Sequence, residues 1–240
     1  MTRLTISSIG KRSLPPQWIN FRRWLQRWFV PAWLGSLRST KPRSDGWGFD
    51  RGRPVDRYYI ESFLEYHRYD MHGRVLEILN SDYADKFGAA IEQMDILDID
   101  PANQQATIIA DLAAADSIQS DSFDCFILTQ TLQLIFDVKS AIAHSHRILR
   151  PGGVLLVTIP AVSRLAGDGY TDYWRFTPAS CTRLFGDVFG AEQVTITAYG
   201  NVLSAVAFLE GMASEELSRR ELDVIDERYP VVLAIRAVKK

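Results

Sequence analysis

Apolar residues in this chain occur in short, nearly continuous runs that are separated by longer stretches with helical periodicity. Runs that are apolar throughout are typical of strands buried on both faces. Such strands alternating with helices predict an α/β fold, in which a mostly parallel sheet is covered by helices on both sides. The strands expected from this pattern are 74–78, 94–99, 106–110, 122–128, 154–159, 194–197 and 231–235.

The helices expected between these strands have recognisable starts and ends. A helix starts at Pro54, and another spans 138–149 and ends before Pro151-Gly152-Gly153. Two more are expected at 178–189 and 202–217. The link between the second and third strands, 101–105, is too short for a full helix, so this face of the sheet is predicted to be thin or covered by the N-terminal segment.

The N-terminal region differs in character from the rest, and we divide the chain into an arm, 1–45, and a domain, 46–240. Within 17–29 an amphipathic helix is expected, before Pro31 stops it. Its apolar face holds Trp18, Phe21, Trp24, Leu25, Trp28 and Phe29, and arginines occupy the opposite face. This face either packs on protein or makes peripheral membrane contact through 17–33. The following segment, 36–53, is rich in Gly, Ser, Pro and Arg and is predicted to be a linker.

Charge is distributed unevenly along the chain. Residues 1–44 carry nine basic and no acidic residues, whereas 45–240 carry 18 basic and 29 acidic ones. A basic arm on an acidic body favours self-docking or an anionic membrane surface over nucleic acid. No uncharged apolar stretch is long enough to span a bilayer, and no signal peptide is predicted. Two cysteines without metal-ligand spacing predict no metal site and no disulfide framework, so we expect a cytoplasmic location. If the arm contacts a membrane and does not pack on protein, this contact is peripheral and at the inner membrane face.

Polar side chains stand at the carboxyl ends of the first four predicted strands. These residues are Glu77, Asp98, Asp111 and Gln130. Ligands of open parallel sheets bind beyond these ends, and an acid about 20 residues after the first strand is suited to accept hydrogen bonds from a ribose diol. Asp98 has this spacing from Glu77, and Asp111 is suited to accept from an adenine amino group. Alternatively, these aspartates cap the turns that follow them.

Several motifs at these strand ends resemble those of class I methyltransferases, most closely the methyltransferase type 11 group, over about residues 50–240. They are Val75-Leu76-Glu77-Ile78, Leu97-Asp98-Ile99-Asp100-Pro101, Asp111-Leu112, Ser122-Phe123-Asp124 and 147–155 with its Pro-Gly-Gly turn. The resemblance implies a seven-stranded Rossmann-like sheet, mostly parallel with an antiparallel edge region. It also implies S-adenosyl-L-methionine as cofactor, bound by Glu77, Leu79, Asn80, Ser81, Asp98, Ile99, Asp111, Leu112 and Gln130.

The chain departs from that family in the loop after the first strand. The family has glycines there, whereas this chain has Leu79, Ser81 and Tyr83. Side chains at these positions either crowd the cofactor or force the loop onto another path. An alternative function is therefore a catalytically inactive accessory or scaffold protein. A nicotinamide-dependent dehydrogenase is not favoured, because no Gly-x-Gly-x-x-Gly follows the first strand.

Residues for the methyl acceptor are expected after the fifth strand. Segments 50–59 and 172–178 resemble a bacterial subgroup associated with cell-surface glycan systems. We therefore expect a small-molecule or glycan acceptor, methylated at oxygen. Tyr173 and Trp174 are candidates to wall the acceptor and Arg175 to pair with a carboxylate or phosphate, although the two aromatic residues could instead pack the loop onto the domain. No residue is identified as a catalytic base, and methyl transfer requires one only when the acceptor must lose a proton.

Overall fold

A computed structural model describes residues 35–167 and 169–240. The amphipathic helix expected within 17–33 lies outside these residues. Two compact units divide the chain at residue 40, and the described part of the first is one 3-10 turn, η1 (Gly35–Arg38). The second unit, Lys41–Lys240, contains all seven strands and six α-helices of the described chain.

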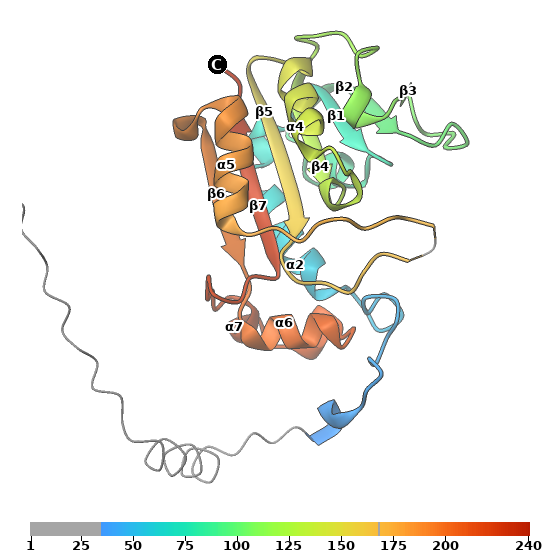
Figure 1. The fold of residues 1–240 in the computed structure, drawn as a ribbon, viewed down its shortest axis with the longest axis vertical. Coiled ribbons are helices and arrows are strands. Elements are labelled where there is room, and N and C mark those ends of the chain that lie inside the picture. The colour runs from blue at the N-terminus through green and yellow to red at the C-terminus, as the bar shows by residue number, and fades with distance from the viewer. Residues whose placement is uncertain (1–34, 168) are drawn as a thin grey trace, which may run out of the picture. The chain divides into compact units, whose positions relative to one another are not determined.

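The second unit is built on a seven-stranded sheet with the order β3-β2-β1-β4-β5-β7-β6 (Figure 1). Strands β1 to β5 pair in parallel, and β7 pairs antiparallel with both β5 and β6. The strands are β1 (His72–Ile78), β2 (Ala90–Asp98), β3 (Ile108–Ile109), β4 (Phe123–Thr129), β5 (Leu149–Pro160), β6 (Val194–Tyr199) and β7 (Val232–Val238). The predicted fold class, a mostly parallel sheet with an antiparallel edge, is confirmed.

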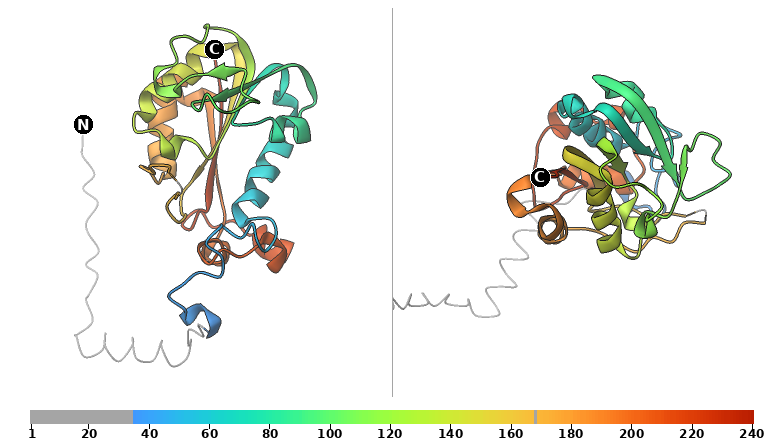
Figure 2. Two further views of the ribbon diagram at one scale, coloured as in Figure 1. Left: turned by 90° about the vertical axis from the view of Figure 1, so that its right-hand side faces the viewer. Right: turned by 90° about the horizontal axis from the view of Figure 1, so that it is seen from above.

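Helices lie on both faces of the sheet, as Figure 2 shows from two further directions. The α-helices are α2 (Val55–Tyr66), α3 (Asp82–Phe87), α4 (Val138–Ile148), α5 (Pro178–Phe189), α6 (Val202–Leu209) and α7 (Arg219–Leu222). Short 3-10 turns are η2 (Arg68–Asp70), η3 (Leu112–Ala114), η4 (Leu132–Leu134), η5 (Ala191–Gln193) and η6 (Ser214–Glu216). Helix α5 coincides with its predicted range, because Thr177 caps its start, Pro178 fits the first turn and Gly190 follows its end.

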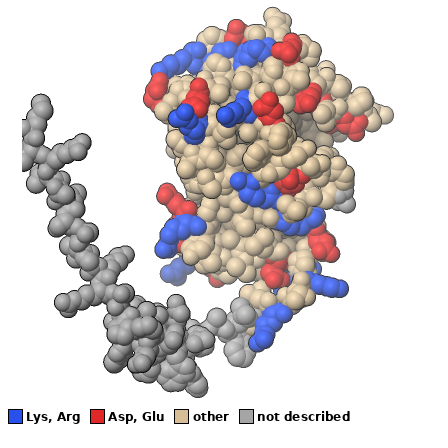
Figure 3. Space-filling model, in the orientation of Figure 1, with Lys and Arg blue, Asp and Glu red and all other residues tan. Residues whose placement is uncertain are grey.

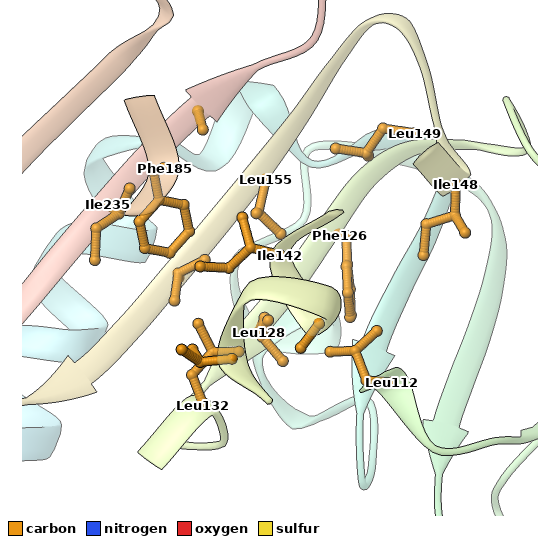
Figure 4. Packing of buried hydrophobic residues seen from close by; sticks show 14 of the residues in the cluster. Leu112, Phe126, Leu128, Leu132, Ile142, Ile148, Leu149, Leu155, Phe185 and Ile235 are labelled. Atoms are coloured by element: carbon orange, nitrogen blue, oxygen red, sulfur yellow. The ribbon is translucent and has the colours of Figure 1, made fainter. Parts of the chain in front are cut away.

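Two hydrophobic cores cover the two faces of the sheet, since alternate strand residues point to opposite sides. In β4, Phe126 and Leu128 face the core shared with α4 and α5, part of which is drawn in Figure 4. Their neighbours Cys125 and Ile127 face the core shared with α2. The strands are therefore buried on both faces, which explains their continuous apolar sequence.

The predicted helix 202–217 is wrong in its second half. Helix α6 ends at Leu209, and Gly211 adopts φ 68°, a left-handed conformation that ends helices. A Cβ atom at Gly211 would collide with the backbone oxygen of Ser44, so glycine is required for this close approach. The short helix α3 was not predicted from the sequence, and the β2–β3 link contains turns and no helix, as its length predicted.

Residues 43–54, most of which the sequence predicted as linker, form an ordered segment that we call the strap. The backbone N–H groups of Arg43 and Ser44 donate to Glu210 O (2.7 and 3.3 Å), and Ser214 N–H donates to Arg53 O (2.7 Å). The indole of Trp47 donates to Ser163 Oγ (3.3 Å) and lies 3.5 Å from the Arg164 guanidinium. These bonds join the strap to segments distant in sequence, which local composition cannot indicate.

Charged side chains of this unit are interspersed on the face drawn in Figure 3. Basic and acidic groups alternate there, so the excess of acidic residues after residue 44 does not form one acidic patch on that face. Within residues 35–167 and 169–240, no helix is long and apolar enough to cross a bilayer.

Candidate active site

A cavity of about 670 Å³ lies at the carboxyl ends of β1, β2, β3 and β4. Its floor is made by the strand ends, and its walls come from the strap, α2, α3 and the residues that follow β4. This is the edge at which open parallel sheets bind ligands, and the volume is in the range of small-molecule and cofactor sites.

Almost all of the predicted cofactor contacts meet in this cavity. The lining includes Glu77, Leu79, Asn80, Asp98, Ile99, Asp111, Leu112 and Gln130. Ser81 does not line it, because its hydroxyl group donates to Asp85 Oδ2 (2.7 Å) within α3. The parallel strands thus bring together residues that are separated by up to 53 positions in the sequence.

Glu77 is buried at the end of β1, where it anchors the start of α3. Its two carboxylate oxygens accept hydrogen bonds from the backbone N–H groups of Tyr83 (3.1 Å) and Ala84 (2.8 Å). Burial raises the pKa of Glu77 to about 7 from 4.5, although the two N–H donors lower it. The geometry makes Glu77 a fixed support of the cavity floor, with both oxygens already bonded to backbone.

The loop after β1 contains no glycine, and its backbone is held by hydrogen bonds to the neighbouring strand and link. Leu79 adopts φ 72° and its N–H donates to Leu97 O (3.0 Å) on the neighbouring strand. Asn103 Nδ2 donates both to Leu79 O (2.7 Å) and to Asp98 Oδ2 (2.6 Å). Leu79 stands where the family has glycine, and its backbone adopts the left-handed conformation that glycine favours.

Asp98 and Asp111 each accept a hydrogen bond from their own turn. Asp98 Oδ1 accepts from Asp100 N–H (3.0 Å), and Asp111 Oδ1 accepts from Ala113 N–H (2.8 Å). Capping and ligand binding are compatible, because an ionised carboxylate offers about four acceptor positions. The hydrogen bonds from these turns fix the orientation of both carboxylates at the cavity wall.

Gln130 ends β4 in a left-handed conformation with φ 48°. Its N–H donates to Thr158 O (2.7 Å), and its C=O accepts from Gln133 Nε2 (2.8 Å). The side-chain Nε2 is buried and has no hydrogen-bond partner in the described chain. A buried donor without a partner costs about 1–3 kcal/mol, so this amide is placed to bind an acceptor atom in the cavity.

Helices α2 and α3 form one wall of the cavity. From the sequence, residues 56–58 at the start of α2 are expected either to cover the methionine end of the cofactor, as the helix before the first strand does in relatives, or to serve an internal Asp56–Arg57 or capping role. Arg57 lines the cavity between the rings of Phe49 and Tyr83, at 5.9 and 5.6 Å from their centroids, and donates to the Tyr83 hydroxyl. It forms no ion pair within the described residues, whereas its neighbour Arg53 pairs with Glu61 (2.9 Å). Arg57 is therefore the cavity cation available to a ligand carboxylate or phosphate.

The predicted acceptor residues lie beside the cavity and do not line it. Tyr173 and Trp174 donate their backbone N–H groups to Gln133 O (2.8 and 3.3 Å), and Trp174 Nε1 donates to Ile135 O (3.0 Å). Phe136, which the sequence analysis missed, is 68% exposed and packs on both rings. Ile135, the residue before it, lines the cavity, so these three aromatic residues flank its mouth.

Arg175 is occupied within its own loop. Its guanidinium group donates to both oxygens of Asp172 (2.6 and 2.9 Å) and to Arg164 O (2.7 Å). The pair lowers the pKa of Asp172, which keeps that carboxylate ionised. We therefore assign Arg175 to holding the loop together and not to pairing with a ligand anion.

Comparison with known families agrees with this geometry. A family model described as "Methyltransferase domain" matches residues 66–157, which contain β1 to β4 and most of β5. The matched segment supplies Glu77, Asp98, Asp111 and Gln130 to the cavity. Over 92 of its 240 residues the chain is thus similar to a methyltransferase domain.

Solved structures with the same fold share little sequence with this chain. A SAM-dependent methyltransferase from Archaeoglobus fulgidus is 15% identical, with 76% of this chain and 94% of that chain covered and a TM-score of 0.52. The 1,6-didemethyltoxoflavin-N1-methyltransferase of Burkholderia thailandensis, solved with 1,6-didemethyltoxoflavin and S-adenosylhomocysteine, is 14% identical, with 99% and 98% covered and a TM-score of 0.50. No curated protein matches in sequence.

The fold alone does not determine the reaction. The cyclase SpnF is 16% identical to this chain, with 84% of this chain and 87% of that one covered and a TM-score of 0.51. Because one fold supports different chemistries, the function has to be argued from the cavity. No group of three or more His, Cys, Asp or Glu side chains in the described ranges is arranged to hold a metal ion.

Proposed function

We propose that this cavity binds S-adenosyl-L-methionine and that the protein transfers its methyl group to a small-molecule acceptor. The match to the methyltransferase family model supports both the cofactor and the enzyme class. The observation that carries the proposal is the meeting of Leu79, Asp98 and Asp111 in one cavity at the sheet edge. A bound sulfonium cofactor supplies an activated methyl group, so the protein has to bind and align the two reactants.

The chemical character of the lining fits the parts of this cofactor. Asp98 would accept from the ribose hydroxyls and Asp111 from the adenine amino group, while Ile99 and Leu112 offer apolar contact. The Arg57 guanidinium would pair with the methionine carboxylate. Glu77 supports the floor through α3 and makes no proposed contact with the reacting atoms.

We further propose an oxygen acceptor of the small-molecule or cell-surface glycan type. The exposed rings of Phe136, Tyr173 and Trp174 beside the cavity mouth support an acceptor with a ring face. Among the described residues, the Arg175 guanidinium beside these rings is held by Asp172, which favours a neutral acceptor.

Titration calorimetry with S-adenosylmethionine and S-adenosylhomocysteine tests the cofactor. Binding of both ligands to the full-length protein is expected at micromolar concentration. An absence of heat and of any thermal shift at millimolar ligand would overturn the proposal. It would favour instead the inactive accessory protein, for which the departure at Leu79 is the supporting feature.

We also propose that the basic, Trp-rich arm holds the protein at the inner membrane face. The nine basic residues of 1–44 and the aromatic pattern of 17–33 support this. A full-length variant with Trp24→Glu and Trp28→Glu should sediment at least fivefold less with anionic vesicles than the unmodified protein. Equal sedimentation of the two proteins would reject a membrane role for the arm.

A further inference from the structure

Helix α6 exposes an apolar surface outside the cavity. None of the residues of Val202–Leu209 is charged, and Ser204 alone is polar. One side of the helix packs into the core through Ala207 and Phe208. The side turned away from the core carries four aliphatic side chains that are 37–55% exposed, which are Val202, Leu203, Val206 and Leu209. Surface helices normally carry polar residues on this side, so the composition of α6 indicates a partner that covers it.

The exposed surface continues past the helix into the segment that follows α7. Asn201 Nδ2 donates to Glu221 O (2.8 Å) and to Val224 O (2.7 Å), which fixes this segment against the first turn of α6. Val224 and Ile225 are also exposed. We use the name α6 face for the six aliphatic residues together, which are Val202, Leu203, Val206, Leu209, Val224 and Ile225.

The strap connects the α6 face with the basic arm. The backbone N–H groups of Arg43 and Ser44 donate to the oxygen of Glu210, the residue that follows α6. The chain before Arg43 belongs to the basic, Trp-rich arm. Figure 1 shows α6 and α7 at the lower end of the second unit, toward which the arrow of β5 points. The α6 face therefore lies at the end of the sheet that holds the cavity.

The composition and size of the α6 face favour lipid over protein as its partner. Protein interfaces are enriched in aromatic side chains, methionine and arginine, and stable ones bury about 800 Å² on each partner. The α6 face consists of Val, Leu and Ile, and its helix is eight residues and about 12 Å long. A bilayer surface needs no matching shape, and it covers aliphatic side chains that project from one short helix.

Charged groups near the α6 face do not by themselves attract anionic lipid. Residues 201–229 carry three basic and seven acidic residues. Two of the acids are paired within the domain, Asp226 with Arg228 (2.7 Å) and Glu216 with Arg51 (2.6 Å). Lipid contact at this face therefore depends on apolar insertion, while the electrostatic attraction comes from the arm.

We propose that the α6 face inserts into the surface of a lipid bilayer and is a second membrane contact, separate from the arm. The inference does not depend on methyl transfer. It rests in part on the membrane role proposed for the arm, which the experiment tests separately. Apolar insertion adds affinity in proportion to the area buried. Docking through this face brings the cavity end of the domain to the lipid surface.

Vesicle sedimentation of the full-length protein tests the proposal. Val206→Gln and Leu209→Gln together remove two aliphatic side chains and leave the net charge unchanged. This α6 double variant should bind mixed vesicles of phosphatidylcholine and phosphatidylglycerol about tenfold more weakly than the unmodified protein. Tyr66→Gln with Tyr69→Gln is the matched control, because both rings are exposed near the start of β1, away from the cavity. This control should bind vesicles as the unmodified protein does.

A fluorescent label reports directly whether the α6 face meets lipid. Cys125 and Cys181 are the two cysteines of the chain and both are buried, so the thiol introduced by Val206→Cys can be labelled selectively. An environment-sensitive dye at this position should shift its emission to the blue when vesicles are added, whereas the same dye at Tyr69→Cys should not. A dye at Val206→Cys that is already shifted without vesicles overturns the inference, because protein would then cover the face.

The two membrane contacts can fail separately. Unchanged vesicle binding by the α6 double variant overturns the inference, even where Trp24→Glu with Trp28→Glu lowers binding. A loss in the α6 double variant with none in the arm variant rejects the role of the arm and supports the α6 face. If the unmodified protein binds no vesicles, both membrane proposals fail, and methyl transfer is still decided by the calorimetry.

Discussion

The polar side chains on the two sides of the cavity differ in whether the protein itself already satisfies their hydrogen bonds. At the ends of β1, β2 and β3, Glu77, Asp98 and Asp111 all accept hydrogen bonds from backbone N–H groups of the loops that follow. On the side of β4 and β5, the Gln130 amide has a buried N–H group without a partner. Phe136, six residues further along the chain, is 68% exposed and packs on Tyr173 and Trp174.

This difference indicates which side of the cavity binds the cofactor, a ligand that is always the same molecule. Carboxylates that are already oriented lose little freedom when a ligand arrives, which suits one cofactor bound in one pose. Exposed rings on a loop can accommodate different partners, and loops on a rigid scaffold are where specificity changes most readily. We therefore assign the β1–β3 side to the cofactor and the β4–β5 side to the acceptor.

The largest expected effect is on the free energy of unfolding and comes from Glu77, the most buried acid on the β1–β3 side of the cavity. Its folded pKa of about 7 lies above the ordinary 4.5, so the unfolded chain releases this proton first as the pH rises. The contribution of Glu77 to stability is therefore full below pH 4.5 and is lost as the pH rises through 7. Unfolding free energy of the unmodified protein should fall between pH 4.5 and 8 by about 3 kcal/mol more than that of Glu77→Gln.

Denaturant titrations across this pH range provide the measurement. Both proteins share every other titrating group, so the difference between the two curves isolates Glu77. Glu92→Gln, at an exposed position on β2, controls for the loss of one carboxylate and should follow the unmodified protein. Parallel curves for the unmodified protein and Glu77→Gln would show that the pKa of Glu77 is not raised in the folded protein.

Removal of Asp98 gives the next largest effect. Asp98→Ala should weaken S-adenosylhomocysteine binding about 50-fold, or roughly 2.3 kcal/mol, because two hydrogen bonds to a charged group are lost. Asp100→Ala is the matched control, since Asp100 is exposed, caps the same turn through Ala102 N–H (2.8 Å) and does not line the cavity. Equal losses in the two variants would mean that Asp98 acts only by shaping the turn.

Substitution of Arg57 should have a smaller effect on ligand affinity, and this effect should depend on the methionine carboxylate of the ligand. Arg57→Met should weaken S-adenosylhomocysteine binding about tenfold, since a guanidinium–carboxylate pair is lost. Binding of 5′-methylthioadenosine, which has no carboxylate, should change less than twofold. Arg53→Met, which removes a guanidinium already paired with Glu61, is the control. A similar loss for both ligands would place the methionine carboxylate elsewhere.

Most of the β1–β3 side of the cavity could be predicted from the sequence, because the signals for it lie in short segments of the chain. Glu77, Asp98 and Asp111 each stand at the end of an apolar run, and parallel strands bring their carboxyl ends to one edge. Helix α5 was predicted at its full length because its cap, its first-turn proline and its terminal glycine are all adjacent in sequence. Such signals do not depend on the rest of the fold.

The remaining site residues depend on contacts that are distant in sequence. The strap looked like a linker, yet Trp47 packs on Arg164 across 117 positions, and Phe49 reaches the cavity as a result. Arg57 becomes a cavity residue only because α2 lies beside α3 and places it against Tyr83.

For two of the predicted ligand contacts, Ser81 and Arg175, a carboxylate nearby in the sequence indicates that the side chain is bonded within the protein. Ser81 is four residues before Asp85 and Arg175 three residues after Asp172, and in both cases these nearby carboxylates take the side chain. Such pairs at helical or turn spacing compete with ligands for the same groups.

The smallest effect compares two exposed phenylalanines, one on each side of the cavity. Phe49 (61% exposed) lies against Arg57 on the cofactor side, and Phe136 (68% exposed) lies against Trp174 on the acceptor side. Phe49→Ala should weaken S-adenosylhomocysteine binding about threefold, because the guanidinium loses one of its two rings. Phe136→Ala should leave this affinity unchanged, and both variants should keep stability within about 0.5 kcal/mol. The same titration serves both proteins, and a threefold loss in Phe136→Ala with none in Phe49→Ala would reverse the assignment of the two sides.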